Sequence, residues 1–299
     1  MFPRVFSSKV LRHFAGERRR VVSDWRILLA CRQITAIANE PLADEKRAIA
    51  IRRELESRGD LTPVDGPGLS GIFVIDAPYA SLLEVLEEQI VQEANPWTVF
   101  SHLTALAYHG LTDLIPSQIH ATRFRDGSDP RIPLGTNPED WTGLRYPTPR
   151  FPGEVRGIKI LWSETKGEHR FGITVGYSMG TPIYVTDVER TLIDILRAPD
   201  HAGGIAKVFH AWRLAEGIDL DRLVDYTDRF DKQILRQRVG FMLQSLGLHH
   251  PRMEGWRSKL LRGGSVRLIA DGEYSKTFSS EWNLSLNVPD SVLSILTGK

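Results

Sequence analysis

The tripeptide Glu164-Thr165-Lys166 combines residue types that could hydrolyse a phosphodiester. It follows Ile158 to Trp162, whose β-branched and aromatic content predicts a strand. An acid and a lysine in the pattern D/E-x-K after a strand are typical of nucleases that hold Mg²⁺ and orient a water molecule. Such a site needs a second acid, and Asp129-Pro130 has the reverse order within a predicted loop. A Mg²⁺-dependent nuclease is therefore one alternative, and an ordinary polar turn after a strand is the other.

The sequence His249-His250-Pro251 contains two metal-ligating residue types. Adjacent side chains point apart, and no Cys or further His follows at zinc-ligand spacing, so we expect both histidines at the surface. The sequence also contains no glycine-rich phosphate loop, no nucleophile elbow and no H-E-x-x-H motif. We therefore expect a protein that is not an enzyme and that has neither a cofactor nor a bound metal.

A cationic face near the N-terminus indicates a different chemistry, the binding of a polyanion. Residues 1–60 contain 13 Lys or Arg against 8 Asp or Glu, although the whole chain has a net charge of only +1. The 3.6-residue period places Ala48, Ile51 and Leu55 on one helix face. The opposite face then carries Lys46, Arg47, Ala50, Arg53 and Ser57.

Cations, a small residue and a hydroxyl suit the phosphate-lined major groove of DNA. The alternative is a solvated surface helix. The loop from Arg18 to Arg20 adds cations that could contact the DNA backbone. The predicted DNA-binding residues are Arg18, Arg19, Arg20, Lys46, Arg47, Arg53 and Ser57.

Local signals define the elements that must position this face. Asp44 is a suitable N-cap and Gly59 a suitable C-terminal residue, so the cationic helix spans the residues between them. Leu61 to Ile75 contains two short apolar runs around a Pro/Gly turn, which predicts a hairpin.

Two further helices precede the cationic one. The first carries the apolar stripe Phe6, Val10 and Phe14, and the second begins after the N-cap Ser23 and buries Cys31. Three helices and a hairpin predict a winged helix-turn-helix domain in residues 1–78, whose third helix reads the groove.

The remainder of the chain predicts a second, larger domain. Residues 79–94 are acidic and amphipathic, so we expect a connecting helix that phosphate would repel. Residues 95–299 contain strand candidates followed by helix candidates, an order typical of an α+β domain. The strand candidates are 117–124, 158–162, 171–175 and 183–186, and the helix candidates are 187–197, 204–215, 220–230 and 231–246. Between them, residues 125–152 form a long Pro/Gly/Asp-rich loop with Trp141, Leu144 and Tyr146 as its anchors.

Composition limits the cellular setting. The 299 residues are 41% hydrophobic and 25% charged, which suffices for two ordinary cores. One cysteine rules out an internal disulfide, and no apolar run approaches the roughly 20 residues of a membrane helix. We expect a cytoplasmic protein that does not contact membranes.

Three phrases in the second domain carry a family resemblance when they are considered together. They are S-H-L-T-A-L-A-Y-H-G-L (Ser101 to Leu111), Y-V-T-D-V-E-R-T-L-I-D-I-L (Tyr184 to Leu196) and L-R-Q-R-V-G-F-M-L-Q-S-L-G (Leu235 to Gly247). Behind a winged helix, this order resembles the AbiEi-type antitoxins, the regulator half of bacterial abortive-infection AbiE type IV toxin–antitoxin systems. The resemblance covers the chain from Val21 to Gly247.

The resemblance implies a function for each half of the chain. The N-terminal domain would bind inverted repeats upstream of its own operon as a repressor, with a dimer on the DNA as one possibility. The C-terminal domain would neutralise a nucleotidyltransferase-like toxin without forming a stable complex. A regulator that has kept this fold without a toxin partner is the alternative.

The segment from Tyr184 to Leu196, which matches the family best, contains charged residues that have two explanations. Thr186 and Glu189 fit a capping box, and Arg190 and Asp194 fit an ion pair along a helix surface. The resemblance makes the same helix a candidate for the antitoxic surface. We therefore name Arg190, Asp194 and Arg238 as antitoxin-surface candidates.

Overall fold

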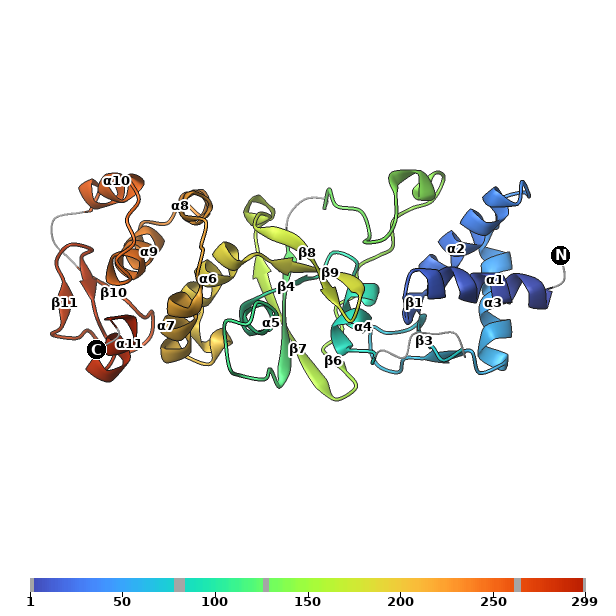
Figure 1. Ribbon diagram of the computed structural model, residues 1–299, viewed down its shortest axis with the longest axis horizontal. Helices are drawn as coiled ribbons and strands as arrows, with labels where there is room; N and C mark the ends of the chain where they lie inside the picture. Colours follow the sequence, from blue (N-terminus) through green and yellow to red (C-terminus); the bar gives the residue numbers. More distant parts are fainter. Residues whose placement is uncertain (1–2, 78–83, 126–128, 261–264, 298–299) are drawn as a thin grey trace. The chain divides into compact units, whose positions relative to one another are not determined.

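The computed structural model describes residues 3–77, 84–125, 129–260 and 265–297 (Figure 1). Helices and strands both occur throughout these ranges, which confirms the α+β class. The chain divides into two compact units. Unit 1 comprises Met1–Val99, Gly127–Trp162 and Val175–Tyr184, and unit 2 comprises Phe100–Asp126, Ser163–Thr174 and Val185–Lys299. The units are thus interleaved in sequence, whereas we expected consecutive segments 1–78, 79–94 and 95–299.

The N-terminal part of unit 1 contains three helices and a small antiparallel sheet. Its elements are α1 (Pro3–Gly16), β1 (Val21–Ser23), α2 (Asp24–Ile37), α3 (Glu45–Ser57), β2 (Leu61–Pro63) and β3 (Ile72–Ile75). The sheet order is β1-β3-β2, with Val21 opposite Val74 and Leu61 opposite Ile75. The hairpin β2–β3 was expected, but β1 was not, because three residues are too few to show an alternating pattern.

The predicted helix ends in this region are confirmed. The Ser23 hydroxyl accepts the N–H of Arg26 at 3.3 Å, and the Asp44 carboxylate accepts the N–H of Arg47 at 2.8 Å. Gly59 follows α3 with φ of +74°, a backbone conformation that favours glycine.

The predicted buried stripes are also confirmed. Phe6, Val10 and Phe14 of α1 pack in one cluster with Cys31 of α2. The α3 residues Ala48, Ile51 and Leu55 complete that cluster from the third helix. This core positions the opposite face of α3 toward solvent.

Cys31 provides a test of this core. Its side chain is fully buried, and burial raises the pKa of the thiol to about 12. Because the thiolate is the reactive form, we expect iodoacetamide at pH 8 to alkylate the folded chain at least about 1000-fold more slowly than the unfolded chain. Mass spectrometry with and without guanidinium measures the two rates, and equal rates would contradict this packing of α2.

The expected connecting helix is instead part of the core of unit 1. Residues 78–83 lie outside the described ranges, and α4 (Glu87–Ala94) is the helix present in the remainder. All its residues from 89 to 94 are buried. We expected one acidic amphipathic connecting helix over residues 79–94, but residues 84–86 are not helical. Glu93 is moreover buried beside the cationic side chains of Arg19 and Arg26.

The long loop is anchored to the helices of unit 1. Its short helix η1 (Pro138–Trp141) packs on α2, with the Trp141 ring centroid 5.6 Å from that of Trp25. Gln33 of α2 donates a hydrogen bond to Asp140 at 2.8 Å. Leu144 packs against the same core and the Tyr146 ring lies 4.9 Å from Trp141, so all three predicted anchors make contacts.

A mixed six-stranded sheet contributes strands to both units. It contains β4 (Val99–Phe100), β5 (Gln118–Phe124), β6 (Glu154–Val155), β7 (Ile158–Thr165), β8 (Ile173–Ser178) and β9 (Thr181–Thr186). The order is β6-β7-β5-β4-β9-β8, with β4 parallel to β9 and β6 antiparallel to β7. All four predicted strands are present, and β8 begins two residues later than expected.

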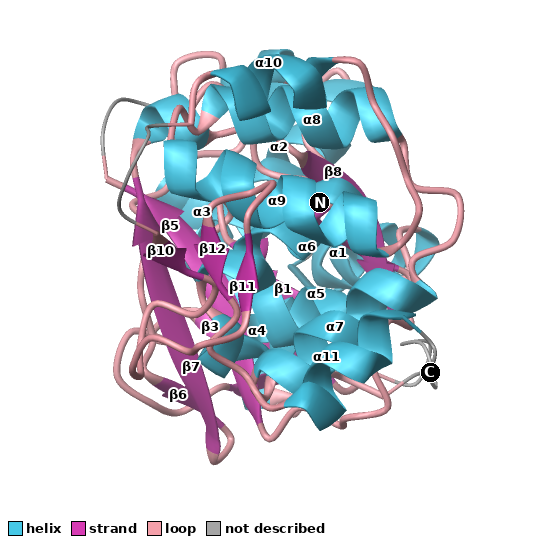
Figure 2. Cartoon of the chain, turned by 90° about the vertical axis from the view of Figure 1, so that its left-hand side faces the viewer, coloured by secondary structure: helices cyan, strands magenta, loops and turns pink. Residues whose placement is uncertain are grey.

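Unit 2 is mainly helical. Its helices are α5 (His102–Tyr108), η2 (Gly167–His169), α6 (Val188–Arg197), η3 (Pro199–Ala202), α7 (Ile205–Leu214), α8 (Leu220–Arg229), α9 (Gln233–Ser245), α10 (Arg252–Ser258) and α11 (Asp290–Thr297). The four predicted helices correspond to α6 to α9, whereas α10 and α11 were not predicted. A small sheet of β10 (Val266–Arg267), β12 (Leu284–Ser285) and β11 (Phe278–Ser279) follows in that order. The last helix, α11, packs beside α7 (Figure 2).

Within the described ranges, no helix has both the length and the apolar character that crossing a membrane requires.

Candidate functional site

The outward face of α3 carries most of the side chains predicted for it. Lys46, Arg53 and Ser57 are exposed, and they lie opposite the buried Ala48 and Leu55. In the described part of the chain, neither Lys46 nor Arg53 is placed in an ion pair. This face therefore presents two cations outside ion pairs, together with a hydroxyl that donates to the carbonyl of Glu54 at 2.8 Å and has its oxygen lone pairs left for accepting.

Ile49 belongs to the same outward region and was missed by the sequence reasoning. Its side chain is 41% exposed. An exposed apolar side chain beside cations suits the methyl group of thymine in the major groove. The helical period could have predicted this position, because Ile49 lies three residues after Lys46 and therefore on the same side of the helix.

Two of the other predicted cations are engaged within unit 1. The Arg47 guanidinium lies 4.2 Å from the centre of the Phe6 ring and 3.2 Å from the Glu40 carboxylate. Arg20 donates to the carbonyl of Ile75 at 3.0 Å. Arg18, in contrast, is exposed, with φ of +53° in the loop after α1.

The prediction that Arg19 contacts DNA is inconsistent with its position. Arg19 is only 6% exposed, and its guanidinium lies 3.2 Å from Glu17 and 3.6 Å from Glu93. Burial, reinforced by the neighbouring Arg26, lowers the pKa of Arg19 to about 10, so it remains charged at neutral pH. A run of three arginines does not reveal which of them turns inward.

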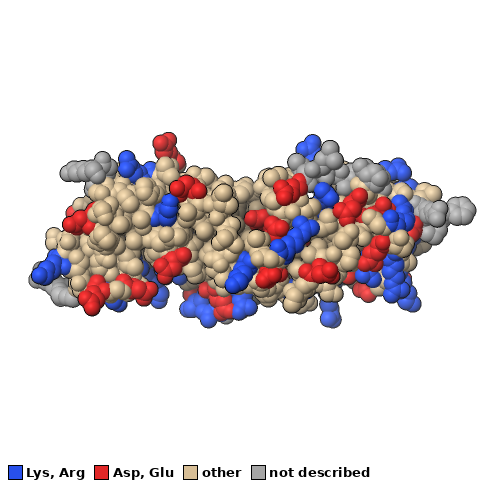
Figure 3. Space-filling view, turned by 90° about the horizontal axis from the view of Figure 1, so that it is seen from below, with Lys and Arg blue, Asp and Glu red and all other residues tan. Residues whose placement is uncertain are grey.

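Charges of both signs are interspersed on the face of the molecule that Figure 3 shows. Lys and Arg side chains alternate with Asp and Glu there, in agreement with the small net charge of the sequence. Any affinity for a polyanion must therefore arise from a local arrangement such as the α3 face rather than from the overall charge.

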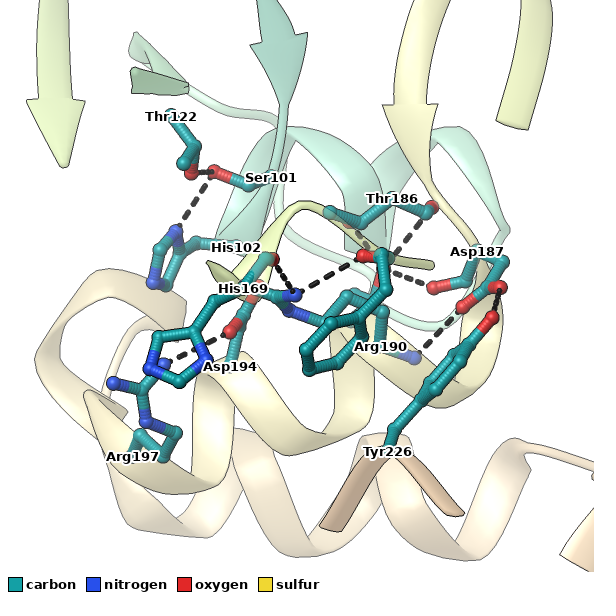
Figure 4. A network of polar contacts seen from close by, with 12 residues as sticks. Ser101, His102, Thr122, His169, Thr186, Asp187, Arg190, Asp194, Arg197 and Tyr226 are labelled. Atoms are coloured by element: carbon teal, nitrogen blue, oxygen red, sulfur yellow. Dashed lines mark hydrogen bonds and ion pairs between the residues drawn. The ribbon is translucent and has the colours of Figure 1, made fainter. Parts of the chain in front are cut away.

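The antitoxin-surface candidates Arg190 and Asp194 form a buried ion pair on α6 (Figure 4). They are 2% and 3% exposed, and the Arg190 Nε donates to Asp194 at 2.9 Å. Burial acts to raise the pKa of Asp194, but Arg190, His102 and Arg197 outweigh it and hold that pKa below its usual value. The expectation of a surface role is wrong for this pair, because the helix face that carries it packs inward.

The remaining donors of Arg190 tie α6 to the segment before β8. Its Nη1 donates to the carbonyls of His169 at 2.8 Å and of Phe171 at 3.0 Å. The guanidinium also lies 4.7 Å from the ring centres of Phe171 and Phe230. This environment satisfies a buried cation and thereby holds these elements together.

The start of α6 is capped differently from the predicted Thr186/Glu189 box. Asp187 is the N-cap and accepts the N–H of Arg190 at 2.8 Å, while Tyr226 donates to its other oxygen at 2.9 Å. Glu189 instead accepts the N–H of Asp219 at 2.9 Å. The predicted N-cap, Thr186, is therefore wrong by one residue, because the next residue, Asp187, caps the helix.

Arg238, the third antitoxin-surface candidate, is also buried. It is 6% exposed, and its Nη2 donates to the carbonyl of Arg267 at 3.0 Å. Burial lowers the pKa of its guanidinium, and Arg267 adds to the effect. A surface role is thus wrong for Arg238 as well, since it joins α9 to β10.

A cavity of about 300 Å³ in unit 2 brings Glu164 near Asp194. Glu164 forms an ion pair with Arg123 and lies 3.8 Å from Arg125, while Lys166 lies 3.2 Å from Glu168. Both acids of this cavity are thus occupied by arginines. The arrangement does not provide Mg²⁺ with the pair of available carboxylates that a D/E-x-K nuclease requires.

The same cavity is lined by two histidines that the sequence reasoning did not single out, His102 and His201. Neither lies at zinc-ligand spacing from another ligand along the chain, so no local pattern identified them. The exposed position of His249 agrees with the prediction, whereas His250 is half-buried and lies 2.9 Å from Asp221.

Comparison with known proteins identifies a fold and no family. No protein-family model matches the chain, and neither does any curated protein. The crystal structure of the RV2827C protein from Mycobacterium tuberculosis is similar, with a TM-score of 0.53 and 16% sequence identity. The match covers 99% of this chain and 95% of that one, so the similarity extends over both units.

Proposed function

We propose that the chain is a cytoplasmic, sequence-specific DNA-binding protein whose residues 1–78 form a winged helix-turn-helix. The observation that carries the proposal is the exposed face of α3, with Lys46, Arg53 and Ser57 opposite a buried apolar face. Helix α2 precedes it and the hairpin of β2 and β3 follows it. This order of elements supports the proposal, because a wing follows the recognition helix in such domains. Ile49 extends this face, and Arg18 is exposed in the loop after α1. Arg19, Arg20 and Arg47 are instead engaged within unit 1.

The chain would act as a repressor of its own operon and as an antitoxin of the AbiEi type. The three phrases between Ser101 and Gly247 support this part of the proposal. The buried positions of Arg190, Asp194 and Arg238 mean that any surface acting against the toxin is made by other residues. No catalytic role, cofactor or stable toxin complex is part of the proposal.

The primary test is a titration of the full chain with DNA from upstream of its own reading frame. With about six to ten phosphate contacts, the affinity should fall by about 10³- to 10⁵-fold between 50 and 200 mM salt. The upstream DNA should bind more tightly than a scrambled duplex of equal length, and the preference should map to an inverted repeat. Binding that depends on neither salt nor sequence would refute the DNA-binding proposal.

Arg53→Ala is expected to weaken binding to the upstream DNA by about 1–3 kcal/mol if the guanidinium reads a base, with little change for scrambled DNA. If it contacts a phosphate, both duplexes should weaken alike and the salt slope should fall by about one. Fluorescence anisotropy measures both. Arg252→Ala is the matched control, because Arg252 is 51% exposed on α10 in unit 2. Unchanged affinity of the Arg53 variant for both duplexes would remove Arg53 from the interface.

The AbiEi resemblance implies an operator with an inverted repeat, and on such an operator two copies would present two α3 helices to two half-sites. Analytical ultracentrifugation with one-half-site and two-half-site duplexes tests it. Two chains on the longer duplex and one on the shorter are expected.

The antitoxin role has its own test. Co-expression of the full chain with an adjacent nucleotidyltransferase-like gene should restore growth. If no such gene is adjacent, or if growth is not restored while DNA binding is intact, the alternative of a stand-alone regulator is favoured.

A further inference from the structure

Three histidines from separate segments of unit 2 come together around one point. His102 begins α5, His120 lies in β5 and His201 lies in η3. One ring nitrogen from each lies within 4.8 Å of those of the other two. A search of the described ranges for three or more His, Cys, Asp or Glu side chains that could bind one metal ion finds this cluster.

The rings pack directly against one another. The ring centres of His102 and His201 are 5.0 Å apart, those of His120 and His201 are 5.4 Å apart, and those of His102 and His120 are 6.1 Å apart. All three rings are thus close enough to contribute a nitrogen to one ion.

The hydrogen bonds of the cluster leave ring nitrogens available. His102 uses its Nδ1 with the Ser101 hydroxyl at 2.9 Å, and that hydroxyl lies 2.9 Å from Thr122 (Figure 4). The Nδ1 atoms of His120 and His201 are buried without a hydrogen-bond partner in the described chain. A buried nitrogen without a partner is unfavourable, so two adjacent rings lack an interaction that a bound ion would supply.

The acids that line the cavity beside the cluster are engaged by arginines. Asp194 pairs with Arg190 at 2.9 Å, and Glu164 forms an ion pair with Arg123. The three imidazoles are therefore the side chains that converge on one point there.

The backbone of His102 is in an uncommon conformation. Its φ is +49°, in the left-handed region that residues other than glycine rarely adopt. Such strain persists where surrounding contacts determine the conformation, and it concentrates at binding sites. Here the strained residue carries one of the three converging rings.

We propose that His102, His120 and His201 form a binding site for a divalent transition-metal ion, for which Zn²⁺ is the best fit. Three imidazole nitrogens at about 2.0–2.1 Å suit tetrahedral Zn²⁺, whereas Mg²⁺ and Ca²⁺ prefer oxygen ligands. Tetrahedral coordination requires ligand nitrogens about 3.3 Å apart, so the rings would turn inward from their present separation. The fourth position would face the cavity that His102 and His201 line, where water can enter.

Residues next to the three histidines would help to hold the ligands in place. Ser101 and Thr122 orient His102 in the way that second-layer residues orient metal-binding histidines. The ion would connect the neighbouring elements α5 and β5 to η3, which lies about 80 residues further along the chain, and would stabilise unit 2. This inference does not depend on DNA binding or on an antitoxin role.

The test uses the full-length chain after removal of metal with a chelator, followed by dialysis. Calorimetric titration with ZnCl₂ should give a single ion per chain, and CoCl₂ should produce the intense visible absorption of tetrahedral Co²⁺. His201→Asn should weaken Zn²⁺ binding by at least about 100-fold, because one of three ligands is lost. His249→Asn is the matched control, because His249 is 63% exposed. The affinity of this variant for Zn²⁺ should equal that of the wild type.

Three results would overturn the proposal: no Zn²⁺ binding at a hundred-fold molar excess, Co²⁺ spectra without tetrahedral bands, or wild-type affinity in His201→Asn. If that variant does not fold, nuclear magnetic resonance of the wild-type imidazoles replaces it. Zn²⁺ should then shift the ring nitrogens of His102, His120 and His201, and a shift confined to other histidines would also refute the site.

Discussion

Replacement of Glu93 by glutamine is expected to lower the free energy of unfolding by about 3–5 kcal/mol. Glu93 is the acid that its two buried cationic neighbours, Arg19 and Arg26, share within unit 1. Both Arg26 contacts are short, at 2.8 and 2.9 Å from Nε to the two carboxylate oxygens, and Ser23 donates to the same group at 2.6 Å.

The size of this effect follows from desolvation. Glutamine has nearly the same shape, but it removes the negative charge and leaves two guanidinium groups buried close together. Among the described residues, Arg19 keeps its ion pair with Glu17, and Arg26 keeps the carbonyl of Leu134 at 3.2 Å. A buried charge that loses its partner costs far more than an exposed one, because water cannot replace the lost interaction.

Urea unfolding followed by circular dichroism measures the change for Glu93→Gln. Glu87→Gln is the matched control, because it is the same substitution on the same helix at a more exposed residue that is not paired in the described structure. The control should change the free energy of unfolding by less than about 0.5–1 kcal/mol. Equal effects of the two substitutions would contradict the buried position of Glu93.

Asp194→Asn is expected to lower the free energy of unfolding by a similar amount, about 3–5 kcal/mol. Asp194 accepts from Arg190 at 2.9 Å and from Arg197 at 3.3 Å. Asparagine would leave Arg190 charged between the rings of Phe171 and Phe230, with two carbonyls as its remaining acceptors.

This substitution also separates an internal role of Asp194 from a surface role. Thermal unfolding should show a clear loss of stability for Asp194→Asn, and little change for Asp225→Asn, whose partner Arg252 lies 3.8 Å away at a half-exposed site. If Asp194 instead contacted a toxin at the surface, its substitution would abolish toxin rescue and leave stability unchanged. That outcome would contradict the buried position of the Arg190–Asp194 ion pair.

The difference between the large effects expected for Glu93 and Asp194 and the small effects expected for the controls has one cause, which is burial. Glu93 and Asp194 carry their charges where water is excluded, whereas the control residues are more exposed. Neither position could be recognised as buried from the chain alone, because acidic residues on amphipathic helices usually face solvent.

The sequence by itself determined the features that depend on neighbours a few residues apart. Asp44 and Ser23 cap helices because each side chain reaches an N–H three positions ahead. The stripes of α1 and α3 are buried because the helical period places Val10 and Leu55 on a single face. For the same reason, the exposure of Lys46 and Arg53 could be predicted from their spacing.

Only the tertiary structure decided which distant residues share an environment. The run from Arg18 to Arg20 divides into an exposed, a buried and a half-buried arginine because Glu93, more than 70 positions away, attracts only the second. The histidine cluster likewise depends on α5, β5 and η3 meeting in unit 2. Such contacts are selected by packing and desolvation across the whole chain, and no short stretch of sequence contains that information.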